Sequence, residues 1–208
     1  MNNLAYTSQD AATVGPKVEE KVREDVGATT PIPYEVQAGD AGTVTVGSVA
    51  EDIGKYFVGG RANSLFTLNF SFSEPRVAQL MANVTRYGRG SYVGLLVYTT
   101  VLSKPIAAEV ILEDPKLFGK PKFGGDPAVS AKLNANGPLV KLAGELARTE
   151  TTVASGQIKI KRNCRLVPSE AGAALILNTL PRPLKMGISA TTDAGQFLQL
   201  AGMIEAAL

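Results

Sequence analysis

Hydrophobic and polar positions form their clearest pattern over Ser64–Thr100, where three periodicities follow one another. Residues 65–72 alternate apolar side chains with threonine, asparagine and serine, which is the period of a strand with one buried face. Pro75 suits the first turn of a helix, and four apolar residues follow it at helical spacing: Val77, Leu80, Met81 and Val84. Two glycines can end that helix, and residues 91–101 then form an apolar, β-rich run. The pattern predicts a strand, a short helix over Pro75–Arg86, a glycine turn and a buried strand.

Further β-type runs, separated by glycine and proline, continue along the chain beyond residue 42. Strands are predicted in five segments: residues 43–49, 106–114, 151–167, 172–180 and 184–192. Residues 114–127 contain three prolines and three glycines, which is the composition of a long surface loop. Val129–Glu150 fits a strand followed by either a helical turn or a second strand, and residues 196–208 fit a strand or a helix. Seven or eight strands with few helices indicate an all-β domain.

Residues 1–42 differ from the rest of the chain and are predicted to form an N-terminal arm. Apolar residues are sparse there, and three prolines interrupt any long element. The segment 18–26 offers two turns of helix, which are too few to be stable alone in water. The arm carries three basic and seven acidic residues, whereas residues 43–208 carry 18 basic and 12 acidic residues. An acidic arm is therefore expected to precede one mildly basic domain spanning residues 43–208.

Composition argues against most catalytic chemistry. The 208 residues, 45% of them hydrophobic, suffice for one well-filled core, but they include no histidine, the usual general base and metal ligand near neutral pH. Cys164 is the single cysteine, so the chain can form neither an internal disulfide nor a thiolate metal site. The lack of tryptophan and an aromatic content of 6% argue against a carboxylate glycosidase that stacks sugars. We expect no enzyme activity, no catalytic residue, no cofactor and no metal site.

The order of elements is similar to that of a known family. An N-terminal arm precedes strands with a short helix between an early pair, and Tyr87-Gly88-Arg89-Gly90-Ser91 leads into a buried strand. This arrangement resembles the jelly-roll coat proteins of small icosahedral positive-strand RNA viruses, in the picorna-like and plant-virus group. The resemblance rests on residues 64–102 and on the overall element order. It implies an eight-stranded antiparallel jelly-roll sandwich with one or two short helices and an extended N-terminal arm.

The same resemblance implies a function. The chain would assemble with copies of itself into an icosahedral shell, in a virion made in the host cytoplasm, with genomic RNA on the inner face. We expect no membrane partner, because no apolar segment approaches the roughly 20 residues that span a bilayer and no secretory signal is visible. Many plant-virus coat proteins begin with an arginine-rich arm, whereas this acidic arm is expected to run along neighbouring subunits. The alternative function is a β-sandwich module that recognises carbohydrate or protein through its loops.

Two groups of basic residues are candidates for RNA contact. Lys159, Lys161, Arg162 and Arg165 form the densest group, and three of them project from one face if residues 158–166 form a single strand. Lys120 and Lys122 lie in the predicted loop beside aromatic residues that can stack on bases. The competing interpretations are a solvated sheet face for the first group and a loop pinned by its aromatic residues for the second. Acidic residues at both ends of that loop also allow a calcium site between subunits, although their spacing matches no dedicated calcium loop.

Overall fold

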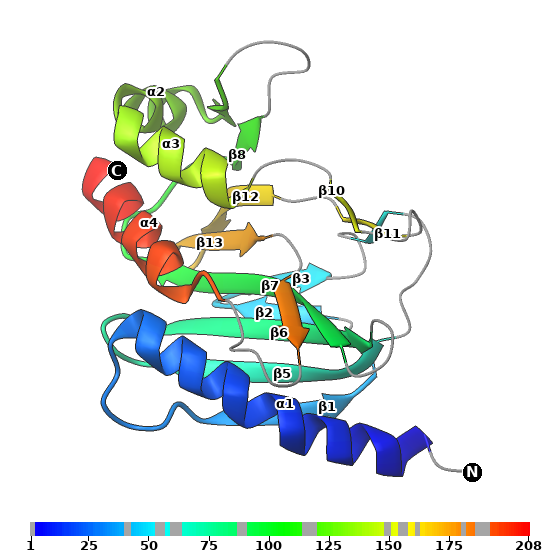
Figure 1. The fold of residues 1–208 in the computed structure, drawn as a ribbon. Helices are drawn as coiled ribbons and strands as arrows, with labels where there is room; N and C mark the ends of the chain where they lie inside the picture. The colour runs from blue at the N-terminus through cyan, green and yellow to red at the C-terminus, as the bar shows by residue number, and fades with distance from the viewer. Residues whose placement is uncertain are drawn as a thin grey trace.

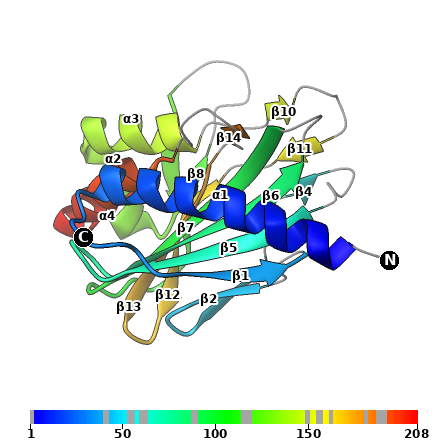
Figure 2. The same cartoon turned by 60° about the horizontal axis from the view of Figure 1, so that its bottom comes forward.

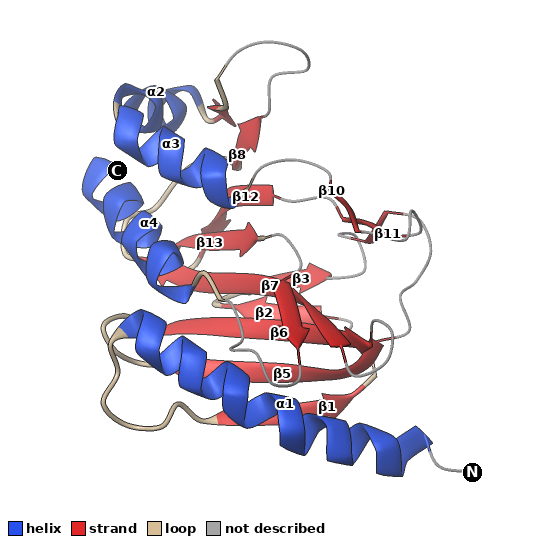
Figure 3. Cartoon of the chain, in the orientation of Figure 1, coloured by secondary structure: helices blue, strands red, loops and turns tan. Residues whose placement is uncertain are grey.

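The structure is a computed structural model with four helices and a large β-sheet (Figure 1). It describes residues 3–39, 43–52, 57–58, 64–86, 91–113, 120–147, 151–153, 158–160, 163–179, 182–185 and 192–208. The helices are α1 (Asn3–Val26), α2 (Pro127–Ala135), α3 (Gly137–Leu146) and α4 (Ala194–Ala207). Figure 3 shows the helices gathered on one side of the sheet.

Nine strands form the main sheet, and every pairing in it is antiparallel. Eight of them follow the spatial order β1 (Tyr34–Ala38), β5 (Ser64–Phe72), β6 (Ala78–Arg86), β7 (Ser91–Leu102), β13 (Gly172–Asn178), β12 (Asn163–Ser169), β8 (Val110–Glu113) and β9 (Lys122–Gly125). The ninth strand, β14 (Arg182–Lys185), pairs with the first part of β7. Two smaller sheets contain the remaining strands: β10 (Thr151–Val153), β11 (Ile158–Ile160) and β4 (Phe57–Val58) in one, and β2 (Thr43–Val46) and β3 (Val49–Asp52) in the other.

These elements confirm a largely β, antiparallel architecture and correct the expected helix content. Four helices are present where one or two short ones were predicted, and they cover one face of the main sheet (Figure 1). The β2–β3 hairpin lies on the opposite face, and its tip is fixed where the Glu170 N–H donates to Ser48 Oγ at 3.1 Å. The main sheet therefore has one face packed against the helices and one face that carries the β2–β3 hairpin.

The segment predicted as a helix, Pro75–Arg86, is instead mostly strand β6. It pairs with β5 on one side and β7 on the other, with Leu80 opposite both Phe70 and Tyr98. Leu80 and Met81 point to opposite faces of the sheet, and both are buried. Because both faces are covered, apolar residues occupy consecutive positions, and their spacing matches a helix as well as a central strand. Residues 64–72 and 91–102 are strands, as predicted.

The hydrophobic core lies between the helices and the main sheet. Each strand contributes alternate residues to it, such as Leu68 from β5 and Leu96 from β7. Tyr98 is fully buried, and its ring stacks on that of Phe197 in α4 with 5.2 Å between the centroids. The Asp193 N–H, just before α4, donates to the Tyr98 hydroxyl at 2.7 Å. This pair joins the centre of the sheet to the last helix.

Residues 3–38 do not form the expected extended arm. Residues 3–26 form α1, a helix of 24 residues that continues through Pro16. Its buried residues recur every three or four positions and belong to the same core cluster as the sheet: Ala11, Val14, Val18 and Val22. A Cβ added to Gly195 in α4 would lie 2.4 Å from the Asp25 carbonyl oxygen, so the two helices touch at backbone distance. The burial of this apolar stripe outweighs the helix-breaking tendency of Pro16.

Two further segments are helical rather than extended. Residues 127–135 and 137–146 form α2 and α3, whose first turns are capped by Asp126 and Asn136. Both helices begin with a proline in their first turn, a position that tolerates the missing N–H. The C-terminal segment, which fitted a strand or a helix, is α4. The predicted loop over 114–127 contains strand β9, and its residues 114–119 lie outside the described part of the chain.

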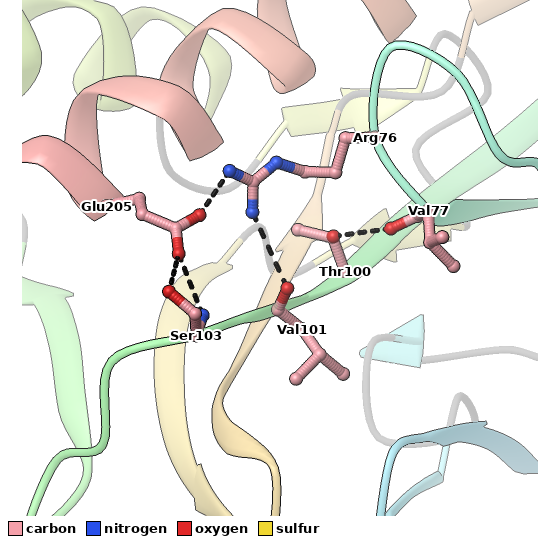
Figure 4. A network of polar contacts seen from close by, with 6 residues as sticks. All are labelled: Arg76, Val77, Thr100, Val101, Ser103 and Glu205. Atoms are coloured by element: carbon pink, nitrogen blue, oxygen red, sulfur yellow. Dashed lines mark hydrogen bonds and ion pairs between the residues drawn. The ribbon is translucent and has the colours of Figure 1, made fainter.

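Glu205 links the C-terminal half of α4 to the residue after β7 and to Arg76 by hydrogen bonds and an ion pair (Figure 4). Its carboxylate accepts hydrogen bonds from the Ser103 hydroxyl and from the Ser103 N–H, the latter at 2.8 Å. The Arg76 guanidinium donates to the other carboxylate oxygen and forms an ion pair with it. The Ser103 hydroxyl is the main cause that lowers the pKa of Glu205 to about 2, with Ser103 N–H and Arg76 adding to it and burial opposing it.

Glu205→Gln is expected to lower the free energy of unfolding at pH 7 by about 2 kcal/mol, because the charged carboxylate is stabilised only in the folded state. The folded pKa lies below the ordinary value, so this contribution is complete above about pH 4.5 and disappears as the pH falls toward 2. Urea unfolding at pH 7 and at pH 2.5 measures the difference between the variant and the wild type. Glu145→Gln is the control, since the Lys141–Glu145 pair is 3.9 Å long and its Glu145 side chain is 55% exposed. If both variants lost the same free energy of unfolding at pH 7, the stabilising role given to the Glu205 carboxylate would be wrong.

Candidate interface at the free edge of the main sheet

Strand β1 borders the main sheet beside β5 (Figure 2), and among the described residues no strand pairs with its other side. The Gly39 N–H donates to the Leu65 carbonyl at 3.1 Å, and the Ser71 N–H donates to the Pro33 carbonyl at 3.3 Å. Backbone direction alternates along a strand, so the odd-numbered residues of β1 point their N–H and C=O groups toward β5. The N–H and C=O groups of Tyr34, Val36 and Ala38 therefore point outward. We call this row the free edge of β1.

The free edge of β1 is short and carries one charged side chain, Glu35, but it has no other feature that usually keeps a sheet edge from pairing. Its five residues, Tyr34–Ala38, include no lysine, no proline and no bulge in their register with β5. Four of the five side chains are exposed, and Val36 is 50% exposed although it is apolar. Pro33 immediately precedes the strand and leaves the pairing groups themselves intact. The edge is short, flat and available for a further strand.

A polar cleft of about 510 Å³ opens beside this edge, on the sheet face that the helices do not cover. Its polar side chains come from neighbouring strands at paired positions: Glu35 lies opposite Asn69, and Ser71 lies opposite Gln79, which in turn lies opposite Thr99. Met81 and Val97 provide apolar surface, and Thr45 of the β2–β3 hairpin closes one side. The cleft therefore offers amides, hydroxyls and one carboxylate in adjacent rows.

The electrostatics of the polar cleft exclude it as a phosphate site. Among the described residues that line it, Glu35 alone is charged, so an anion would meet a carboxylate there. Thr99 is 2% exposed, and its buried hydroxyl has no hydrogen-bond partner within the described part of the chain. Buried hydroxyls are usually paired, so this one marks a polar position that the surrounding side chains leave unsatisfied.

The first group of predicted RNA-contact residues is divided by the fold. Lys159 lies in β11 and Arg165 in β12, which belong to different sheets, so the expected single strand with three basic residues on one face is wrong. Lys161 and Arg162 lie outside the described residues. Arg165 donates to the Glu109 carboxylate at 2.9 Å and is 15% exposed on its side chain. A carboxylate therefore already neutralises much of its charge.

The second group is placed on the surface. Lys120 and Lys122 are both exposed, and Lys122 lies opposite Glu113 in the pairing of β8 with β9. Phe123, between them and α2, is buried, which favours the interpretation that it pins this segment to the domain. Asp126, at the far end, caps α2 by accepting from the Ala128 and Val129 N–H groups. That carboxylate is committed to the helix rather than to a calcium ion.

The described residues contain no cluster of three or more acidic or cysteine side chains placed to hold a metal ion. Burial raises the pKa of Cys164 to about 12, so the thiolate needed of a nucleophile is not formed near neutral pH. None of the described helices is both long enough and apolar enough to cross a membrane.

Comparison with known proteins adds no relative, since no protein-family model, no curated protein and no solved structure matches this chain. The interface candidate therefore rests on geometry alone. Sequence reasoning missed it, because residues 34–38 were assigned to the extended arm. The detectable signal was the alternation of Tyr34, Val36 and Ala38 with Glu35 and Gln37 directly after a proline.

Proposed function

We propose that this chain is a coat protein whose copies assemble into a closed shell around an RNA genome. The observation that carries the proposal is the free edge of β1, where three residues direct backbone donors and acceptors away from the sheet. An exposed edge of this kind pairs with another chain by adding a strand to the sheet. The extended arm and the helix over Pro75–Arg86, which carried much of the resemblance to coat proteins, are replaced by α1 and β6. The free edge of β1 therefore carries the choice of copies of the same chain as the partner.

RNA is proposed as the content of the shell because of the charge of the chain. Residues 43–208 carry six more basic than acidic residues, and Lys120 and Lys122 are exposed. Lys159, Lys161 and Arg162 remain candidates for RNA contact, whereas Arg165 is a poor one because it is paired with Glu109. A phosphate backbone is not expected in the polar cleft, where the one charged side chain among the described lining residues is a carboxylate.

The proposal does not depend on a jelly roll. That fold needs two four-stranded sheets facing each other, and the nine paired strands of the main sheet lie in one sheet instead. Self-assembly requires only a rigid subunit with complementary surfaces. The single core shared by α1, α4 and the main sheet supplies that rigidity.

Purified protein is expected to form megadalton particles, visible by negative-stain electron microscopy and by sedimentation velocity. Val36→Lys places a charge in the middle of the free edge, as natural proteins do to block edge pairing, and should raise the concentration needed for assembly at least about tenfold. Val77→Lys is the matched control, because Val77 is 74% exposed in the turn before β6 and distant in sequence from β1. A wild-type protein that stays monomeric at high concentration across salt and pH would overturn the proposal.

The polar cleft favours a second candidate function, a module that binds a neutral polar ligand such as a saccharide. Amides and hydroxyls both donate and accept, which suits the hydroxyl groups of a sugar. One experiment distinguishes the two candidate functions. Saturation-transfer NMR with neutral mono- and disaccharides detects binding to a monomer in the second case, and no signal accompanies particle formation in the first.

A further inference from the structure

The geometry of the free edge points to a specific contact between two copies: we propose that β1 pairs with β1 of a second copy, antiparallel and centred on Val36. This inference rests on the proposed self-assembly and names the register of one contact in it. It would join two nine-stranded sheets into one continuous sheet about a twofold axis.

The direction of the backbone groups restricts the possible registers. Only Tyr34, Val36 and Ala38 point their N–H and C=O groups outward, so even-numbered residues must face even-numbered residues of the partner. Centring on Val36 places Val36 opposite its own copy and Tyr34 opposite the copy of Ala38. Each of these three facing pairs exchanges two bonds, so about six backbone hydrogen bonds form.

Charge then selects among the remaining antiparallel registers. A pairing centred on Glu35 would place two glutamates directly opposite each other at the close, non-hydrogen-bonded spacing, which is destabilising. A pairing centred on Gln37 would leave Tyr34 without a partner among the described residues of β1. Centring on Val36 uses all three outward residues and sets each Glu35 carboxylate opposite a Gln37 amide, which can donate to it. Of the registers centred on Glu35, Val36 and Gln37, this one alone pairs all three outward residues and avoids facing glutamates.

The side chains at the edge agree with a second copy as the occupant. Val36 lies on the helix-covered face, since its paired residue Leu68 belongs to the core, yet it is 50% exposed. Meeting its own copy would cover two half-exposed valines at once. A five-residue strand pair alone is smaller than an ordinary stable dimer interface, so other contacts must accompany it in a shell.

Disulfide trapping tests the register. Co-expressed Glu35→Cys and Gln37→Cys subunits, distinguished by mass, should cross-link to each other at least about five times more than to themselves, because facing Cβ atoms lie about 5 Å apart and diagonal ones 7–8 Å. Val36→Cys subunits should cross-link as homodimers, and Val77→Cys is the exposed control. Cys164 is fully buried and does not compete.

Charge substitutions at Gln37 give an independent readout that needs no cross-link. Gln37→Glu should weaken association because two like-charged pairs then face each other, whereas Gln37→Lys should preserve or strengthen it in a salt-sensitive manner. Excess Glu35→Cys homodimers, or cross-linking no greater than that of Val77→Cys, would overturn the register. Particles that form without these cross-links would support the coat function and contradict the β1–β1 contact. Cross-linked dimers that never form particles would support the contact and contradict the coat function.

Discussion

Tyr98→Ala is expected to lower the free energy of unfolding by about 4 kcal/mol, which is a large share of the 5–15 kcal/mol of an ordinary domain. Tyr98 is fully buried in the central strand β7, and its removal leaves a cavity beneath α4 and takes away the stacked partner of Phe197. The Asp193 N–H also loses its hydrogen bond to the Tyr98 hydroxyl. Urea or thermal unfolding followed by circular dichroism measures the loss.

Tyr98→Phe separates the ring from the hydroxyl in the same experiment. It keeps the stacking on Phe197 and removes the hydroxyl that accepts from the Asp193 N–H, so a loss of about 1 to 2 kcal/mol is expected. If alanine and phenylalanine cost the same, the ring contributes little and the contact between β7 and α4 is not central to stability.

Val18→Asp is expected to destabilise the whole domain by more than about 4 kcal/mol, because it places an unpaired carboxylate in the core beneath α1. The control is Ala12→Asp, which introduces the same residue on the exposed side of the same helix and should cost no more than about 0.7 kcal/mol. Denaturant unfolding of both variants, read by circular dichroism, compares them directly.

The Val18 experiment also decides between two descriptions of the N-terminal segment. An arm that merely lies on neighbouring subunits would tolerate Val18→Asp without a change in the unfolding of the sheet. A helix that belongs to the core would not, and deleting residues 1–27 should then give an unfolded or aggregated protein. If the isolated subunit unfolds identically with valine and with aspartate at position 18, the N-terminal segment is an arm and not part of the core.

Strands whose residue pattern fits only a strand were predictable, whereas elements whose pattern fits two structures were not. The alternation in β5 identified it, and the continuous apolar run of β13, buried at all seven positions, was also found. Strand β6 was mistaken for a helix because Leu80 and Met81 are buried on opposite faces, which produces consecutive apolar residues. Local spacing does not report how many layers cover a strand.

Helix α1 was missed because the rule that proline interrupts a helix was given too much weight. Pro16 lies inside it, and an interior proline costs a helix about 3 kcal/mol. The stripe from Ala11 to Val22 recovers that cost only when a sheet is present to bury it. The free edge of β1 was equally hidden, because the orientation of its donors is set by pairing with β5, about 30 positions later in the chain.

Because β1 is oriented by its pairing with β5, the sheet would have to fold before the proposed assembly could begin. Residues 34–38 are synthesised before β5, and until β5 arrives they have no fixed direction in which to present donors and acceptors. A growing chain or a misfolded subunit thus lacks the surface that a second copy would match. If β1 pairs with its copy as proposed, the contact would become available only to subunits that have completed their sheet, and correct folding would then precede assembly.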